Sequence, residues 1–258
     1  MPARDLPLLT DAVRAAGEVA LRYWRRKPRA WDKPDGAGPV TEADLAVNAA
    51  LEETLRPARP DYGWLSEESP DSAARLAAPA VFVLDPIDGT RAFMAGEEGF
   101  AIALAVVAQG RVTAGAVYLP ALDRLYAAAE DGAATLNGAP IRASAAAEPE
   151  GARVLTTAGN MAESHWPGGV PQLRRAFRPA LAWRICLVAE GRFDGTITFR
   201  DAWEWDIAAA SLIAARAGAR VTDAAGAPLR FNAPRPQAPG LIAAPPALHA
   251  ALMARARG

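Results

Sequence analysis

The chain has few of the residues on which several common catalytic and structural devices depend. Its 258 residues include a single cysteine, Cys186, so no internal disulfide can form, which is typical of a reducing compartment. The two histidines, His165 and His249, are too few for a histidine-rich zinc site. Lys27 and Lys33 are the only lysines, which disfavours a Schiff base or a phosphate-loop lysine elsewhere in the chain.

A strong net charge and a long apolar run are missing as well, and a signal peptide is not expected. The formal net charge of −1 gives no sign of a surface that attracts a polyanion. The longest apolar runs, near 101–108 and 207–215, fall well short of the roughly 18–20 residues of a membrane span. The N-terminal stretch carries Asp5, Asp11 and Glu18 where a signal peptide would be apolar. We therefore expect a cytoplasmic protein with neither a nucleic-acid polymer nor a membrane as partner.

The most informative stretch is Val81-Phe82-Val83-Leu84-Asp85-Pro86-Ile87-Asp88-Gly89-Thr90. Its four apolar residues predict a short strand, buried on both faces, that leads directly into two carboxylates. Buried carboxylates need a cation, and Pro86 and Gly89 would shape a turn that aims both of them and the Ile87 carbonyl at one point. Such oxygen ligands suit a hard cation such as Mg²⁺. The alternative is a simple tight loop, because Asp-Pro and Asp-Gly are common turn formers.

Thr90 follows where a helix or turn would begin. Free backbone N–H groups beside it could hold a phosphate. A metal cradle next to an anion site indicates a phosphoryl-transfer centre.

Three further acidic positions have an ordinary structural explanation beside a functional one. Glu67 and its neighbour Glu68 lie in a predicted loop, where acids are usually just solvated, yet a short hairpin-like excursion of 18 residues would return them to Asp85. Asp206 opens an alanine-rich helix, where an acid usually serves as a cap. Asp44 lies three residues after Thr41, which is typical of a variant capping box.

The pattern of apolar residues predicts two differently built halves. Helices are expected at 8–26 and 41–55, and then a meander of antiparallel strands at 100–108, 112–119 and 125–129 with a hairpin turn at Asn137-Gly138. A small polar run at 143–151 leads into an alternation that is typical of a layered α/β unit. Its expected strands are 153–157, 193–199, 219–223 and 240–244, and its expected helices are 180–190, 204–217 and 246–257.

Three motifs together resemble the signatures of the inositol monophosphatase superfamily. They are Leu65-Ser66-Glu67-Glu68, the stretch from Asp85 to Thr90, and Trp205-Asp206-Ile207-Ala208-Ala209, and the resemblance covers roughly residues 10–245. It implies an α/β (α+β) fold, a five-layer αβαβα sandwich. Residues 1–142 would form an α+β half that carries Glu67 and the Asp85–Thr90 motif, and residues 143–258 an α/β half that carries Asp206, both in one compact unit.

The resemblance implies ligands for two magnesium ions. Glu67, Asp85 and the Ile87 carbonyl would hold one ion, and Asp85, Asp88 and Asp206 would hold the second. Metals neutralise a phosphomonoester, lower the pKa of bound water and stabilise the leaving alkoxide, so no covalent protein intermediate is needed. Cys186, in an apolar helix, is interpreted as core packing rather than as a nucleophile.

The same resemblance assigns the remaining site residues. Thr90 and Glu67 would orient and deprotonate the attacking water, and Asp88 completes the set of catalytic residues. Gly89, Thr90 and Asp206 would contact the substrate and its phosphate.

Cofactors and partners also follow from the resemblance. Asp44 would serve in the outer shell of the metals or in a third, weaker site, which gives two or three Mg²⁺ ions in all, and Li⁺ is expected to inhibit. The partner would be a small phosphorylated metabolite. Members are often dimers, so a homodimer is allowed, although nothing in the sequence identifies an interface.

Departures from the pattern bear on the substrate. Inositol-selective members carry Gly-Thr or Gly-Ser where this chain has Pro179-Ala180, and a glutamate where it has Phe199. Arg91 and the segment 187–191 are more similar to the bisphosphate nucleotidases, and Arg200 would pair with a second phosphate or be a plain surface arginine. The first choice is therefore a 3′(2′),5′-bisphosphate nucleotidase that converts 3′-phosphoadenosine 5′-phosphate to AMP. The alternative is an inositol-1-monophosphatase or another sugar or polyol phosphatase, such as a histidinol phosphatase.

Two other functions compete with phosphatase activity. A non-catalytic phosphate-binding protein would be expected to lack a catalytic carboxylate or the threonine, and none is missing. A dinucleotide-binding enzyme would carry Gly-x-Gly-x-x-Gly after a strand, and the sequence has no such run.

Overall fold

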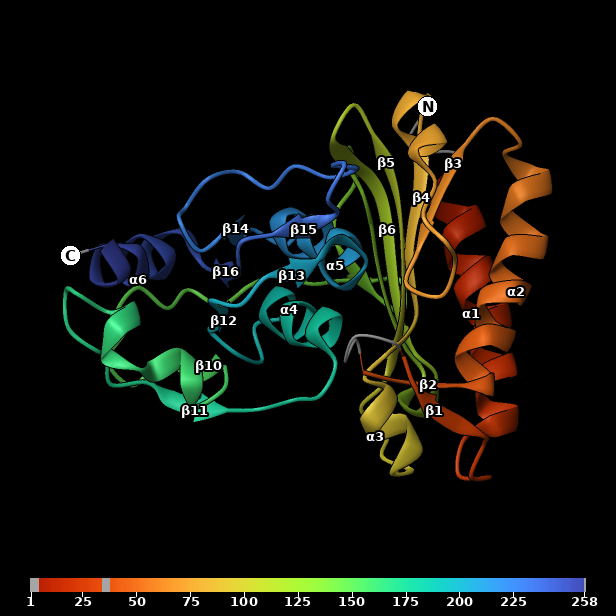
Figure 1. Ribbon diagram of the computed structural model, residues 1–258. Helices are drawn as coiled ribbons and strands as arrows, with labels where there is room; N and C mark the ends of the chain where they lie inside the picture. The colour runs from red at the N-terminus through yellow and green to blue at the C-terminus, as the bar shows by residue number, and fades with distance from the viewer. Residues whose placement is uncertain (1–4, 34–37, 258) are drawn as a thin grey trace.

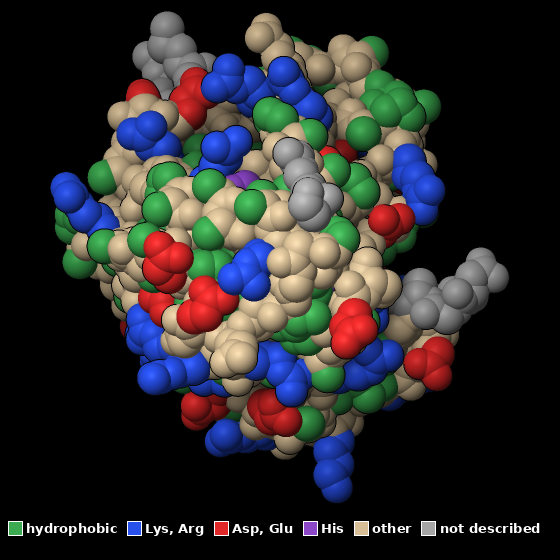
Figure 2. Space-filling view, turned by 90° about the vertical axis from the view of Figure 1, so that its left-hand side faces the viewer, with side chains coloured by type: hydrophobic (Ala, Val, Ile, Leu, Met, Phe, Trp, Pro, Cys, Tyr) green, Lys and Arg blue, Asp and Glu red, His purple; other side chains and the backbone are tan. Residues whose placement is uncertain are grey.

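The computed structural model describes residues 5–33 and 38–257 and has five layers of alternating helices and sheets (Figure 1). The successive layers are α1 (Asp5–Tyr23) with α2 (Glu42–Ala58), a seven-stranded sheet, α4 (Leu181–Ala189) with α5 (Glu204–Arg216), a five-stranded sheet, and α6 (Pro246–Arg257). The predicted αβαβα sandwich is confirmed. On the outer face that carries α6, basic and acidic side chains are interspersed (Figure 2).

The seven-stranded sheet has its strands in chain order. They are β3 (Gly63–Ser66), β4 (Val81–Asp88), β5 (Ala101–Ala108), β6 (Arg111–Leu119), β7 (Arg124–Ala129), β8 (Thr135–Leu136) and β9 (Ala139–Pro140). From β4 onward every neighbouring pair is antiparallel, which confirms the predicted meander and the hairpin at Asn137-Gly138.

β3 is the exception, and it corrects the prediction for Glu67. The strand runs parallel to β4, so its connection, which contains a short 3₁₀ helix (Ala73–Ala77), is a crossover and not a hairpin-like excursion. Ser66 pairs with Leu84, and the next residues along the two strands are therefore Glu67 and Asp85. The parallel direction thus carries both acids to the same edge of the sheet.

The five-stranded sheet contains the four strands expected in the second half and one that was missed. Its order is β11 (Arg174–Ala176), β10 (Arg153–Leu155), β12 (Gly195–Thr198), β16 (Leu241–Ala244) and β14 (Arg220–Thr222). The edge strand β11 begins with two arginines and has no apolar alternation to reveal it. Two small antiparallel pairs, β1 (Ala30–Asp32) with β2 (Pro39–Thr41) and β13 (Ala202–Trp203) with β15 (Gln237–Ala238), were also not predicted.

The helices lie close to their predicted positions, and their buried faces fill two main cores. One core lies between the α1–α2 layer and the first sheet and includes Leu9, Leu51 and Phe82. The other lies around α4 and α5 and includes Cys186, whose interpretation as core packing is confirmed. Among the described helices, none combines the length and apolar character that crossing a bilayer requires.

Close packing of α5 on the first sheet fixes the start of that helix. A Cβ atom added to Gly115, in the middle of β6, would lie 2.9 Å from both the Cα and the carbonyl oxygen of Ala209. Side-chain volume at Gly115 would therefore push the helix backbone off the strand. Asp206 lies in the first turn of the same helix, so its position depends on this approach.

We expect Gly115→Ala to lower the free energy of unfolding by about 1–3 kcal/mol, because the methyl group meets helix backbone that cannot rotate away. Urea denaturation would measure the loss. Gly159→Ala is the matched control, since a Cβ there meets open space and the backbone is not left-handed. Equal midpoints for the two variants would contradict the prediction.

Candidate active site

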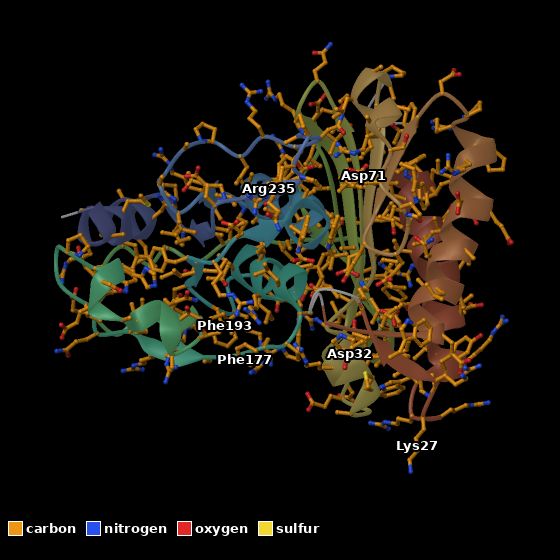
Figure 3. All side chains as sticks on the ribbon, viewed as in Figure 1. Lys27, Asp32, Asp71, Phe177, Phe193 and Arg235 are labelled. Carbon is orange, nitrogen blue, oxygen red and sulfur yellow. The ribbon has the colours of Figure 1, made fainter. Side chains whose placement is uncertain are left out.

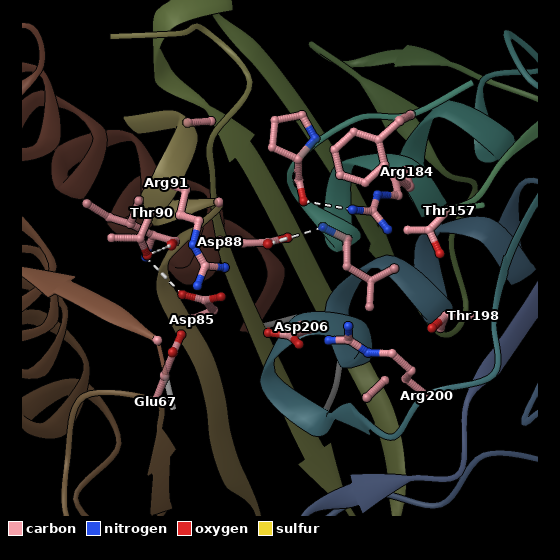
Figure 4. Close-up of a pocket in the computed structure, with 18 of the residues that line it drawn as sticks. Glu67, Asp85, Asp88, Thr90, Arg91, Thr157, Arg184, Thr198, Arg200 and Asp206 are labelled. Carbon is pink, nitrogen blue, oxygen red and sulfur yellow. Dashed lines mark hydrogen bonds between the residues drawn. The ribbon is translucent and has the colours of Figure 1, made fainter. Parts of the chain in front are cut away.

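Acidic side chains from three distant segments converge on one cavity of about 500 Å³ (Figure 4). Glu67 follows β3, Asp85 lies in β4, and Asp206 lies in the first turn of α5. One carboxylate oxygen of each lies within 4.8 Å of the corresponding oxygens of the other two. Asp88, Thr90 and Gly89 line the same cavity, so the structure brings the residues of all three sequence motifs together.

Asp85 and Asp88 both belong to β4, which continues through Asp88, so the turn predicted between them is instead an irregular stretch of strand and the chain turns only at Gly89. The register of β4 against β5 shifts between these residues, and Pro86, which has no N–H to give to the ladder, lies within the irregular part. The Asp85 carboxylate accepts a hydrogen bond of 2.9 Å from the Ile87 N–H. Gly89 then adopts a φ of +94°, in the left-handed region that glycine favours, and begins α3 (Thr90–Met94).

Asp88 lies in the cavity but faces a second helix. Its two oxygens accept hydrogen bonds from the Leu181 and Ala182 N–H groups, at 3.1 and 2.7 Å, at the start of α4. Burial nevertheless raises the pKa of Asp88 to about 7. Each carboxylate oxygen has a further lone pair, so these bonds leave room for a metal ion, and the role of Asp88 as a ligand stays a prediction.

Asp44 ties the cap of α2 to the predicted catalytic threonine. One of its oxygens accepts hydrogen bonds from the Thr41 N–H and hydroxyl, at 2.8 and 2.5 Å, and these complete the predicted capping box. Its other oxygen lies 3.3 Å from the Thr90 hydroxyl, which also lies 3.1 Å from the Ile87 carbonyl oxygen. Asp44 therefore helps to orient the Thr90 hydroxyl. Its role in the outer shell of the metals or in a third metal site stays a prediction.

The electrostatics of this cluster favour a cation. Burial first, and then repulsion from Glu67 and Asp88, raises the pKa of Asp85 well above its usual range. Burial, Asp88 and Glu67 do the same to the pKa of Asp206. A divalent cation would remove this repulsion. The available donors are carboxylates and the Ile87 carbonyl, an all-oxygen set that fits Mg²⁺.

Lys33 contributes a charge whose contacts the sequence did not reveal. Its ammonium group lies 2.7 Å from Glu67 and 2.6 Å from Glu68, just after β1. Burial raises the pKa of Glu68 to about 7 even though Lys33 opposes this. The lysine lies 34 positions before Glu67 on a separate element, so no spacing rule could have paired them.

The opposite wall of the cavity is basic. Arg184 and Arg200 line it together with Thr157 and Thr198, whereas Arg91, in α3, lies beside Thr90 on the acidic side of the cavity (Figure 4). Within residues 5–33 and 38–257, neither the Arg91 nor the Arg200 side chain forms a salt bridge with an acid. The structure therefore brings both predicted selectivity residues to the cavity, and their roles stay predictions.

The sequence analysis did not identify Arg184 as a site residue, because the apolar helix that contains it was interpreted only as part of the hydrophobic core. Its guanidinium donates to the carbonyl oxygens of Arg178 and Pro179, at 2.5 and 3.0 Å, and burial lowers its pKa. Phe199 stacks on His165 and meets Trp166 edge-on instead of lining the cavity. The position where inositol-selective members place a glutamate thus offers no acid here.

The chain matches the inositol monophosphatase family over residues 4–258. It belongs to this family. Among its relatives is an inositol-1-monophosphatase of Rhizobium meliloti, 34% identical over 197 residues that cover 72% of this chain and 73% of the relative. A histidinol-phosphatase of Chlorobaculum parvum is 32% identical over 222 residues, 83% of each chain. The 3′(2′),5′-bisphosphate nucleotidase CysQ of Salmonella typhimurium is 30% identical over 231 residues, 88% of this chain and 94% of the relative.

Solved structures show the same fold. The IMPase of Thermotoga maritima superposes with a TM-score of 0.85 at 27% identity, over 100% of this chain and 97% of that one. The extragenic suppressor protein suhB of Bartonella henselae gives a TM-score of 0.83 at 28% identity, over 98% of both chains. Members of the family are phosphatases that in general depend on Mg²⁺, and this chain is accordingly a phosphatase. Similar identities to relatives with three different substrates do not select one substrate.

We expect the metal-free protein to lose stability as the pH rises. Asp88 has a folded-state pKa of about 7 against an ordinary value of 3.8, so between these values the folded state binds more protons than the unfolded state. This contribution to stability is complete below about pH 4 and is lost as the pH rises through about 7. Asp85 and Asp206 shift in the same direction.

Thermal unfolding in a chelator between pH 5 and 8.5 would measure this loss, and added Mg²⁺ should restore more stability at pH 8.5 than at pH 5. Asp206→Asn should flatten the dependence, whereas Asp61→Asn, at an exposed position, should not. Stability that rises with pH in the chelator would contradict the prediction.

Proposed function

We propose that this phosphatase hydrolyses a small phosphomonoester that carries a second anionic group, with 3′-phosphoadenosine 5′-phosphate, cleaved to AMP, as the first choice. The observation that carries the proposal is the division of the cavity into an acidic wall around Glu67, Asp85 and Asp206 and a basic wall with Arg184 and Arg200, to which Arg91 adds a third guanidinium from beside Thr90. The acidic wall suits metal ions at the scissile phosphate. The basic wall suits a charge elsewhere on the substrate.

On the acidic wall, Glu67, Asp85 and the Ile87 carbonyl would hold one Mg²⁺, and Asp85, Asp88 and Asp206 a second. When bound, the metal neutralises phosphate charge and lowers the pKa of bound water. Glu67 would accept the proton of the attacking water. Thr90, held by Asp44 and by the Ile87 carbonyl, would orient that water.

On the basic wall, the arginines would hold the second anion. A guanidinium binds a phosphate through two parallel N–H donors, and Arg91 and Arg200 have no acidic partner among the described side chains to compete for them. Arg184 is already fixed by two carbonyl oxygens, so it loses little freedom when it binds. The relatives named as bisphosphate nucleotidases agree with this assignment.

A second candidate is a phosphatase of inositol phosphate, histidinol phosphate or another polyol phosphate. It is favoured by the 34% and 32% identity to relatives with those names. These substrates carry a single phosphate, so they would leave part of the basic wall without an anion.

Asp85→Asn should lower Mg²⁺-dependent phosphate release at least about 100-fold, because it removes the carboxylate that faces both proposed metal positions. Asp88→Asn should act in the same way. Phosphate release from a panel of adenosine 3′,5′-bisphosphate, inositol 1-phosphate, histidinol phosphate and fructose 1,6-bisphosphate would measure both. Asp61→Asn is the exposed control. Full activity in Asp88→Asn, or tight binding without turnover of any compound, would rule out the proposed mechanism.

Arg200→Gln should raise the KM for adenosine 3′,5′-bisphosphate about tenfold or more, because a charge-assisted hydrogen bond to the second phosphate is lost. The KM for inositol 1-phosphate should change much less. Arg192→Gln, at an exposed arginine outside the cavity, is the matched control. Equal changes in KM for the bisphosphate and the monophosphate would argue against a second anion at Arg200.

A further inference from the structure

A second cavity of about 520 Å³, called the annex below, opens beside the active site. It is lined by Arg91, Ala92, Glu97, Glu98, Gly99, Phe177, Arg178, Pro179 and Trp183. Four of these residues, Arg91, Ala92, Phe177 and Pro179, also line the main cavity. The two cavities therefore adjoin along these four residues, next to the acidic wall.

The annex begins next to the predicted phosphate position. A Cβ atom on Gly89 would lie 3.2 Å from the carbonyl oxygen of Gly99 and 3.5 Å from the Cβ of Ala180. Gly99 is part of the annex wall, and Ala180 directly follows Pro179. The wall thus comes so close to the turn that would receive the phosphate that a single added methyl group would meet it.

Phe177 offers an aromatic surface at the junction of the two cavities. With 52% of its surface exposed, it is the most exposed large apolar side chain among the described residues. The guanidinium of Arg184 lies over its ring, 4.4 Å from the centroid, and so supports it. Figure 3 labels Phe177 on the segment that leads from β11 toward α4. A supported but exposed ring at a cavity mouth is a stacking platform.

The rest of the annex is rigid and electrically balanced. The Trp24 indole donates to the Glu97 carbonyl oxygen at 3.1 Å, and Arg25 donates to the Gly96 carbonyl oxygen at the same distance, so the turn that follows α1 holds the loop in place. The lining carries two arginines and two glutamates. Such a lining does not attract a further phosphate, whereas the glutamates can accept hydrogen bonds from ring N–H or amino groups.

We propose that the annex binds a planar nitrogen heterocycle of the substrate, stacked on Phe177, while the phosphate lies at the acidic wall. This inference rests on the proposed phosphatase function and narrows its substrate class to phosphomonoesters that carry such a ring. A purine base and an imidazole share this chemistry. Sugar and polyol phosphates have only saturated rings or open chains, so they lack the planar heterocycle that Phe177 would contact.

The test uses the Phe177→Ala variant and compares substrates with and without a planar nitrogen heterocycle. We expect the preference in kcat/KM for adenosine 3′,5′-bisphosphate over fructose 1,6-bisphosphate to fall about tenfold, through KM rather than kcat. Phe177→Trp should keep the preference. Leu76→Ala, which removes another exposed apolar side chain outside both cavities, should also keep it. A Phe177→Ala variant that keeps its preference for adenosine 3′,5′-bisphosphate and for histidinol phosphate alike, or an equal loss in Phe177→Trp, would overturn the proposal.

A histidinol phosphate arm identifies the ring. A tenfold loss with histidinol phosphate and none with the adenosine bisphosphate would assign the annex to imidazole, and the reverse would assign it to a nucleobase. If no compound is hydrolysed with Mg²⁺, the phosphatase mechanism fails, and the annex is still tested by calorimetry. AMP should then bind about tenfold more weakly to Phe177→Ala than to the unsubstituted protein, with ribose 5-phosphate showing no such difference. Equal AMP affinities would overturn the annex proposal alone.

Discussion

Repulsion between the carboxylates of Glu67, Asp85 and Asp206 is the constraint around which this fold is built. Bringing three carboxylates, one buried and two half-buried, within 4.8 Å costs free energy that local structure alone cannot supply. Strand pairing and helix packing away from the carboxylates offset this free energy. The parallel pairing of β3 with β4 carries Glu67 to Asp85, and the close approach of α5 to Gly115 carries Asp206 to both. A divalent cation bound between these carboxylates would be coordinated by them, and their mutual repulsion would be relieved.

How much of the site the sequence could predict depends on how local each contact is. The turn at Gly89 was predictable because glycine acts on its own backbone, whereas the continuation of β4 through Asp88 was not, because it depends on pairing with β5. The capping box of α2 was predictable because its contacts are local too. The direction of β3 was not, because a run of four residues carries no information on parallel or antiparallel pairing. Arg184 was not recognised either, since an arginine in an apolar helix shows its environment only when the neighbouring elements are in place.

Charge is distributed across the cavity according to the part of the chain that forms each wall. Glu67, Asp85 and Asp88 come from the first sheet, whereas Arg184 and Arg200 come from the segments around α4 and β12. Asp206 is the acid that crosses this division, and it does so from the first turn of α5. A substrate held between the walls would therefore meet metal-binding oxygens on one side and guanidinium groups on the other. In this arrangement the proposed site of hydrolysis, at the acidic wall, is separate from the proposed site of substrate recognition, at the basic wall.

The capping box of α2 gives one carboxylate two duties. Asp44 closes the first turn of a helix with one oxygen and reaches the Thr90 hydroxyl with the other. Because one side chain serves both purposes, few substitutions at Asp44 can be tolerated, whether they arise by design or by mutation. A replacement chosen to make the helix more heat-resistant would also reset the orientation of a hydroxyl in the reaction centre, so durability and turnover cannot be adjusted independently at this position.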